Sequence, residues 1–62
     1  MNTKRMKELR KAKGLSQKDL AEIVEVSQAA ITYFEQGMKV PSVPVLHRIA
    51  ETLGCTMDEL VK

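Results

Sequence analysis

The sequence has very little with which to bind a metal or form a disulfide, since it contains one cysteine, Cys55, and one histidine, His47. A single cysteine excludes an internal disulfide, and one cysteine with one histidine cannot supply a closed zinc site. We expect Cys55 to be a small buried thiol between Leu53 and Met57, and His47 to lie on an exposed helix surface. Neither a glycine-rich loop nor a carboxylate pair accompanies His47, so we expect no enzyme, no metal and no cofactor.

Long apolar runs, strand-like alternation and low-complexity stretches are also missing. No run is long enough to span a bilayer and no signal-peptide pattern is present, so we expect a cytoplasmic protein that does not bind membranes. The absence of alternating apolar and polar residues argues against strands, so we expect an all-α chain. We expect residues 1–62 to form one small domain, with its apolar side chains in a single cluster and no room for a small-molecule sensor.

What the sequence does have is a series of apolar residues at helical spacing, separated by residues that begin or end helices. Met6 and Leu9 mark the inner side of a first helix, which Gly14 ends. A second helix begins at the cap residue Ser16, and Asp19 supplies favourable charge in its first turn. The apolar residues of this second helix are Leu20, Ala21 and Val24.

A third helix follows after only Glu25 and Val26, which are left for the turn. Ser27 is its cap and Gly37 can take the left-handed conformation that ends it. Ala21 has no bulk, which lets the third helix cross close over the second. The apolar residues of the third helix are Ala30, Ile31 and Phe34. Residues 15–37 therefore predict a helix-turn-helix, a motif that can place its second helix in the DNA major groove.

The rest of the chain is also predicted to be helical. Ser42, between two prolines, has the position of a cap for a fourth helix that Gly54 ends. The inner face of that helix carries Leu46, Ile49, Ala50 and Leu53. Thr56 with Glu59 three residues later matches a capping box and opens a short fifth helix through Val61. The predicted fold is a compact five-helix bundle.

Charge is distributed unevenly although the formal net charge is only +2. The first helix is crowded with basic residues, with Glu8 as its only acid: Lys4, Arg5, Lys7, Arg10, Lys11 and Lys13. Such a cluster suits an anionic partner but is equally typical of a solvated helix face. The helix-turn-helix itself is locally acidic, since Lys18 stands there against Asp19, Glu22, Glu25 and Glu35, which weighs against strong nonspecific attraction to DNA.

The chain resembles the lambda-repressor and Cro-like helix-turn-helix family, the XRE family, over essentially its whole length. The matching residues are Leu9-Arg10, residues 14–17, Leu20-Ala21, residues 26–28, Ile31, residues 34–37, Pro41 and residues 46–54. The segment Met57-Asp58-Glu59-Leu60 is similar to the short final helix of that family. The resemblance implies sequence-specific binding of double-stranded DNA by the third helix, and regulation of transcription as a repressor acting on paired half-sites.

Two positions depart from the family pattern. Glu25 stands where the family usually has glycine in the turn between the two helices, and a left-handed backbone there costs about 1 kcal/mol or more for any other residue. We therefore expect a slightly remodelled turn. Tyr33 stands at an outward position that often carries arginine or lysine, so readout of guanine by arginine is absent from this helix.

The resemblance also implies a structural ion pair between Arg10 on the first helix and Glu35 at the end of the third. Members of the family pair an arginine and a glutamate at these positions. A planar guanidinium can hold a carboxylate through two parallel hydrogen bonds and so tie two helices together. We favour this structural role for Arg10 over direct contact with DNA.

Four residues of the third helix are expected to read bases, because they form an outward face opposite Ile31 and Phe34. These are Gln28, Ala29, Thr32 and Tyr33. The amide of Gln28 matches the major-groove edge of adenine and the methyl of Ala29 suits that of thymine, so the half-site should lean towards A·T pairs. Tyr33 could equally stack on a sugar, donate to a phosphate or pack over its own helix.

Contacts to phosphates are expected from residues at the ends of the two helices, where such contacts fix register without carrying sequence. The expected residues are Gln17, Lys18, Ser27, Gln36 and Lys39. Gln17 is the best supported by the resemblance, because its amide and nearby backbone N–H groups can hold a phosphate at the positive helix end.

One small domain reads too few bases to be specific alone, so we expect a homodimer on two half-sites, weak or stable away from DNA. Candidate interface residues are Val43, Val45 and Val61. The competing hypothesis is a protein-interaction module, such as an antitoxin or an antirepressor partner with the same fold. Association of the basic first helix with a membrane is not convincing, since its apolar stripe of Met6 and Leu9 is too narrow.

Overall fold

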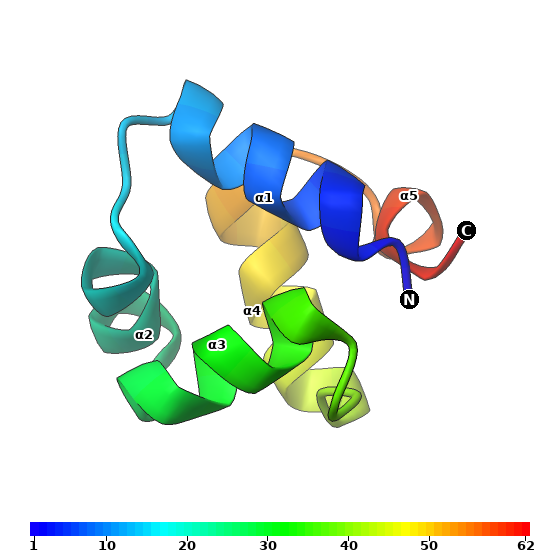
Figure 1. Cartoon of the computed structure of the whole chain (residues 1–62). Coiled ribbons are helices and arrows are strands. Elements are labelled where there is room, and N and C mark those ends of the chain that lie inside the picture. Colours follow the sequence, from blue (N-terminus) through cyan, green and yellow to red (C-terminus); the bar gives the residue numbers. More distant parts are fainter.

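Five helices account for the regular structure in a computed structural model that describes all 62 residues (Figure 1). They are α1 (Thr3–Ala12), α2 (Gln17–Val24), α3 (Gln28–Gln36), α4 (Val43–Leu53) and α5 (Met57–Val61). Helix α1 lies across the top of Figure 1, α2 and α3 lie below it, α4 passes behind them, and α5 lies beside the start of α1. There is no strand, so the prediction of an all-α five-helix bundle is confirmed.

The starts of α2 and α3 are fixed by their serine caps. Ser16 Oγ accepts a hydrogen bond from the Asp19 backbone N–H at 3.0 Å, and Asp19 Oδ2 accepts one from the Ser16 N–H at 3.0 Å. The pKa of Asp19 is lowered from its ordinary value of 3.8, chiefly by the hydrogen bond from the Ser16 backbone and then by the one with the Ser16 side chain. The nearby charge of Lys18 lowers it further. Ser27 Oγ caps α3 by accepting from the Ala30 N–H at 3.1 Å. Both helices therefore begin where the sequence predicts.

The caps of α4 and α5 form less completely than the sequence predicts. Ser42 precedes α4 in extended backbone but its side chain makes no capping bond, and Pro44, which has no N–H, lies in the first turn. Thr56 Oγ1 accepts from the Glu59 N–H at 3.2 Å, but the reciprocal bond of a capping box is absent. The two helices nevertheless have their expected positions, with Gly54 in the left-handed conformation after α4.

A single apolar core joins all five helices. Its eleven buried residues are Met6, Leu20, Ala21, Val24, Ile31, Phe34, Leu46, Ile49, Ala50, Leu53 and Leu60. Helix α2 packs most extensively against α3, and the buried methyl of Ala21 permits their close approach. Each fully buried aliphatic side chain contributes about 1.5–3 kcal/mol relative to its exposed state, so the shared cluster holds the small bundle together. None of the five helices is long and apolar enough to cross a bilayer.

The turn between α2 and α3 differs from the expectation of a remodelled backbone. Glu25 takes the left-handed conformation, with φ 62° and ψ 43°, and is the only residue other than glycine with positive φ. Arg48 of α4 supports this end of α2, because its Nη1 donates to the Val24 carbonyl oxygen at 3.4 Å and lies 3.8 Å from Glu25 Oε2. The chain thus accepts the strain of a left-handed glutamate and keeps the tight turn.

Two side chains are placed differently from the sequence-based expectation. Cys55 is half-buried rather than buried, and the loss of water around it, followed by the negative charge of Glu59, raises the pKa of its thiol. Val45, expected on the surface, is half-buried and packs against the core. Both residues pack at the edge of the apolar cluster, Val45 from the first turn of α4 and Cys55 from the turn between α4 and α5.

Candidate nucleic-acid interface

The outer side of α3 is available to a ligand. Gln28, Ala29 and Tyr33 are exposed and Thr32 is half-buried, while Ile31 and Phe34 of the same helix are in the core. The four outer residues line one shallow hollow of about 420 Å³. The predicted base-reading residues are therefore brought together on one face of a helix whose opposite face is fixed in the core.

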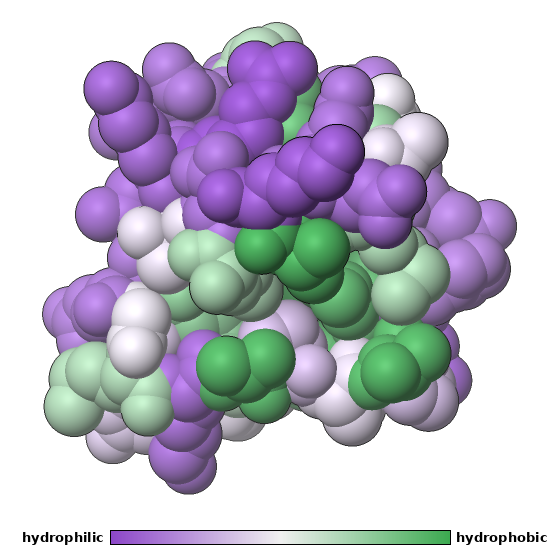
Figure 2. Space-filling view, turned by 90° about the vertical axis from the view of Figure 1, so that its right-hand side faces the viewer, coloured by the Kyte–Doolittle hydropathy of each residue, from purple (hydrophilic) through white to green (hydrophobic).

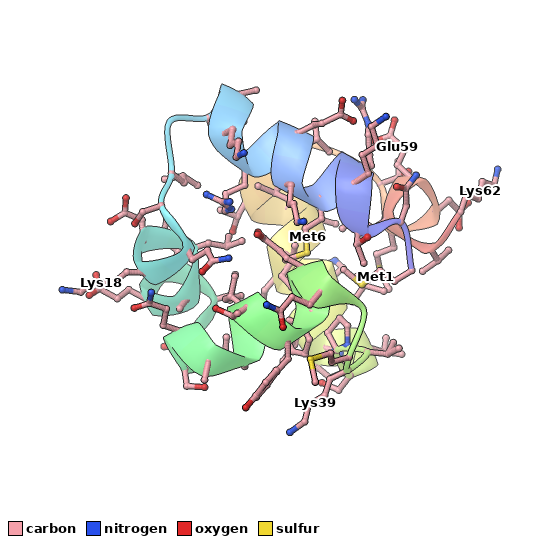
Figure 3. All side chains as sticks on the ribbon, in the orientation of Figure 1. Met1, Met6, Lys18, Lys39, Glu59 and Lys62 are labelled. Carbon is pink, nitrogen blue, oxygen red and sulfur yellow. The ribbon has the colours of Figure 1, made fainter.

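A lysine lies at each side of this face. Lys18 projects outward from α2 and Lys39 projects outward beyond α3, both away from the bundle (Figure 3). The ammonium nitrogen of Lys39 lies 5.2 Å from the centre of the Tyr33 ring, a distance that allows a cation–π contact. Tyr33 therefore stands beside a cation at the edge of the exposed face of α3.

A buried ion pair fixes α3 to α1. Arg10 Nε donates to Glu35 Oε2 at 2.6 Å and Arg10 Nη2 donates to Glu35 Oε1 at 3.2 Å. The third guanidinium nitrogen, Nη1, donates to the Leu15 carbonyl oxygen at 2.8 Å. Both partners are buried, with exposed fractions of 8% for Arg10 and 2% for Glu35. The two bonds have the fork geometry that gives the guanidinium and the carboxylate a defined orientation, so the pair sets how α3 lies against α1.

Gln17 is held by this ion pair, and Thr32 by Gln17, in a way that could not be read from the sequence. Gln17 Nε2 donates to Glu35 Oε1 at 3.1 Å, and Thr32 Oγ1 donates to Gln17 Oε1 at 2.9 Å, with the Gln28 carbonyl oxygen also 3.1 Å away. From the sequence, these two side chains are expected to make separate contacts to DNA. Gln17 is 18 residues from Glu35 and 15 residues from Thr32 along the chain. A local sequence pattern therefore cannot indicate that the three share a network.

The remaining residues predicted to contact phosphates lie at helix ends, as expected from the boundaries of α2 and α3. Lys18 is exposed in the first turn of α2, Gln36 is exposed at the last position of α3, and Lys39 follows in the loop. The Ser27 oxygen accepts the capping bond of α3, which leaves its hydroxyl hydrogen available to a ligand.

The basic residues of α1 and its C-terminal cap, Lys13, divide into one structural and five free side chains. Arg10 is taken up by Glu35, whereas none of the other five is within ion-pair distance of a carboxylate. The hydrophilic band over the top of the molecule in Figure 2 includes this helix. The free residues are Lys4, Arg5, Lys7, Lys11 and Lys13, all of them exposed.

A capped helix, a tight turn and a second helix with one face in the core and one in solvent define the helix-turn-helix class of proteins. Within this class, the model of the Helix-turn-helix family matches residues 6–60. The chain therefore belongs to the helix-turn-helix family of the XRE, or lambda-repressor-like, type.

Three relatives have similar sequences. The HTH-type transcriptional regulator DdrOP3 of Deinococcus deserti is 34% identical over 94% of this chain, and the HTH-type transcriptional activator BcrR of Enterococcus faecalis is 37% identical over 92%. The chain spans only 45% and 28% of the lengths of these two proteins. An HTH-type transcriptional regulator of Methanothermobacter thermautotrophicus is 45% identical over 79% of this chain, and the match covers 71% of that protein.

Two solved structures of the regulator SinR have the same fold. SinR in complex with DNA superposes with a TM-score of 0.89 and 28% identity, and the match covers all of both chains. SinR in complex with SinI superposes with a TM-score of 0.90 over the whole of this chain and 61% of the SinR chain. The arrangement of the five helices is thus the same as in a protein solved with DNA.

Proposed function

We propose that this chain is a transcriptional regulator that binds double-stranded DNA in a sequence-specific way, with α3 in the major groove. The observation that carries the proposal is the exposed face of α3, where amide, methyl and hydroxyl groups stand on a helix fixed by the core and by the Arg10–Glu35 pair. The whole-chain similarity to SinR, which was solved in complex with DNA, supports the same interpretation.

The chemistry of the exposed face favours A·T pairs. The Gln28 side chain makes no hydrogen bond within the protein, so both its donor and its acceptor are available to the N6 and N7 atoms of adenine. Ala29, next to it and exposed, offers a methyl group that suits the methyl of thymine. Tyr33 lies one turn further along and can contact a base edge or a sugar, and Thr32 completes the hollow.

Phosphate contacts at the two sides of the groove would position α3. We assign phosphate contacts to Gln17 and Lys18 at the start of α2, to the Ser27 hydroxyl at the start of α3, to Gln36 at its end and to Lys39 after it. Lys18 and Lys39 project outward as such contacts require. The four free basic residues of α1, together with Lys13, belong to a solvated face in this proposal.

Selection of bound sequences from random duplexes, followed by binding titrations of two variants, tests the proposal. Gln28→Ala should weaken binding to the selected site by about 1–3 kcal/mol and relax the preference at one base pair. Lys39→Ala should weaken binding to all sequences alike and reduce the salt slope by about 0.9. Lys62→Ala is the matched control, since this lysine lies beyond α5 (Figure 3). Equal losses for Gln28→Ala on selected and random DNA, or G·C pairs at its position, would contradict the proposal.

The proposal includes a homodimer on paired half-sites. Four exposed apolar side chains of the α3–α4 loop, the start of α4 and α5 support a contact there: Met38, Val40, Val43 and Val61. The face that carries α5 and this loop shows apolar side chains gathered below the hydrophilic band (Figure 2). The selection experiment reads this out directly, because a dimer yields two half-sites at a fixed spacing whereas a monomer yields one.

We propose that the protein is a repressor, which blocks transcription by occupying a promoter. We also propose that it is cytoplasmic and has no enzymatic activity. A protein-interaction module is the alternative, and the excess of acidic residues in residues 17–37 favours it. Gel-shift titrations at two salt concentrations separate the two, because affinity for DNA falls steeply as salt rises. If the protein binds no duplex even in dilute buffer, the DNA-binding proposal is wrong and the protein-interaction module is the better hypothesis.

A further inference from the structure

The network around Glu35 determines which way the Gln17 amide faces. A carboxylate has no hydrogen to donate, so the atom of Gln17 that lies 3.1 Å from Glu35 Oε1 must be its NH₂ nitrogen. The Gln17 oxygen then has to face Thr32, whose hydroxyl can donate, at 2.9 Å. Both heavy atoms of the amide are thereby held, and one N–H of Gln17 remains free.

Thr32 is the residue of this network that stands next to the DNA-facing hollow. It is half-buried, and its single hydroxyl hydrogen is shared between Gln17 Oε1 and the Gln28 carbonyl oxygen. That hydroxyl has no second hydrogen to offer to a base. The Gln28, Ala29 and Tyr33 side chains, in contrast, are exposed and are hydrogen-bonded to no other side chain.

We infer that Thr32 is a positioning residue rather than a reader of bases: it holds the Gln17 amide against Glu35 so that the free N–H of Gln17 points to a phosphate of the bound duplex. The inference rests on the proposed function and refines it, because it reduces the base-reading set to Gln28, Ala29 and Tyr33. It also connects the buried Arg10–Glu35 pair to the DNA backbone through one side chain. Preordering of Gln17 lowers the entropy that binding must otherwise remove.

Three variants test the inference by titration against the selected site and against each single-base change in it. Thr32→Val removes the hydroxyl at constant shape and should weaken binding to every sequence by the same factor, roughly two- to tenfold, with the base preferences unchanged. Thr32→Ser keeps the hydroxyl and should restore affinity to within about twofold of the original. Gln17→Ala combined with Thr32→Val should bind no more weakly than Gln17→Ala alone, because Thr32 acts through Gln17.

The base preferences decide between positioning and readout. A changed preference at one base pair in Thr32→Val, or losses that multiply in the double variant, would overturn the inference while leaving the proposed function intact. Thermal unfolding of the same variants identifies any loss of affinity that comes from loss of folded protein.

The free protein gives a second readout that needs no DNA. In ¹⁵N–¹H spectra the two side-chain amide protons of Gln17 should be well separated and rigid, since one of them is bound to a carboxylate, and Thr32→Val should make them mobile. The side chains of Gln28 and Gln36 are internal controls, because both are exposed. A Gln17 amide as mobile as those two in the original protein would overturn the inference, whether or not the protein binds DNA.

Discussion

Replacement of Arg10 by methionine measures what the buried ion pair does for the fold. The change removes both guanidinium bonds to Glu35, at 2.6 and 3.2 Å, and leaves a carboxylate that is 2% exposed with Gln17 as its only remaining hydrogen-bond partner. Loss of one member of a buried pair costs about 3–5 kcal/mol, because the other charge stays buried without compensation.

This loss is large for so small a protein. Domains are stable by about 0.05–0.15 kcal/mol per residue, which for a chain of this length is about 3–9 kcal/mol. A loss of 3 kcal/mol or more should therefore lower the midpoint of thermal unfolding by at least about 12 °C. Circular dichroism at a helix band during heating and during urea titration measures both quantities.

Two further variants make the result specific to the ion pair. Arg5→Met is the matched control, since Arg5 is exposed on the same helix and its side chain makes no ion pair, and it should change stability by less than about 0.5 kcal/mol. Arg10→Met with Glu35→Met should recover much of the loss, because no buried charge remains. The stabilising role of the pair is contradicted if Arg10→Met costs no more than Arg5→Met, or if the double variant loses the sum of the two single losses.

Two smaller changes test the local structure around α2. Glu25→Gly should raise the free energy of unfolding by about 1 kcal/mol, because it removes the left-handed strain at φ 62° while losing only an exposed contact at 3.8 Å; an unchanged urea midpoint would contradict this. Asp19→Asn should abolish part of the pH dependence of stability. Since folding lowers the pKa of Asp19, its contribution is present above 3.8 and is lost as pH falls through the lower folded value, so urea midpoints of the two proteins should converge in acid.

The helices and their ends could be predicted from the sequence because their determinants are local. Ser16, Ser27 and Gly37 act within three residues of the backbone groups that they satisfy, and the apolar spacing of α4 identifies its buried face. Ser42 shows the limit of this local reasoning, since its backbone takes the cap conformation while its side chain makes no bond. Capping residues thus predict where a helix starts more reliably than which bond is formed.

The candidate site could be predicted in part. The outward direction of Gln28, Ala29 and Tyr33 follows from helical periodicity once Ile31 is assigned to the core. The bonds of Gln17 could not be predicted, because they depend on three helices meeting at one carboxylate. The shape of the turn at Glu25 was also beyond local reasoning: propensity argues against a left-handed glutamate, and the packing of α2 against α3 outweighs that preference.

Some side chains of α3 are hydrogen-bonded within the protein and others are not, and this difference matters for redesign. Gln28, Ala29 and Tyr33 can be randomised together without disturbing a buried bond, so a library at these three positions should consist mostly of folded proteins. Glu35 and Thr32 belong to the scaffold of such a library and are best kept. The outer side chains of α3 can thus be exchanged while its buried side chains are kept, so the domain is suitable for selecting variants that bind new target sequences.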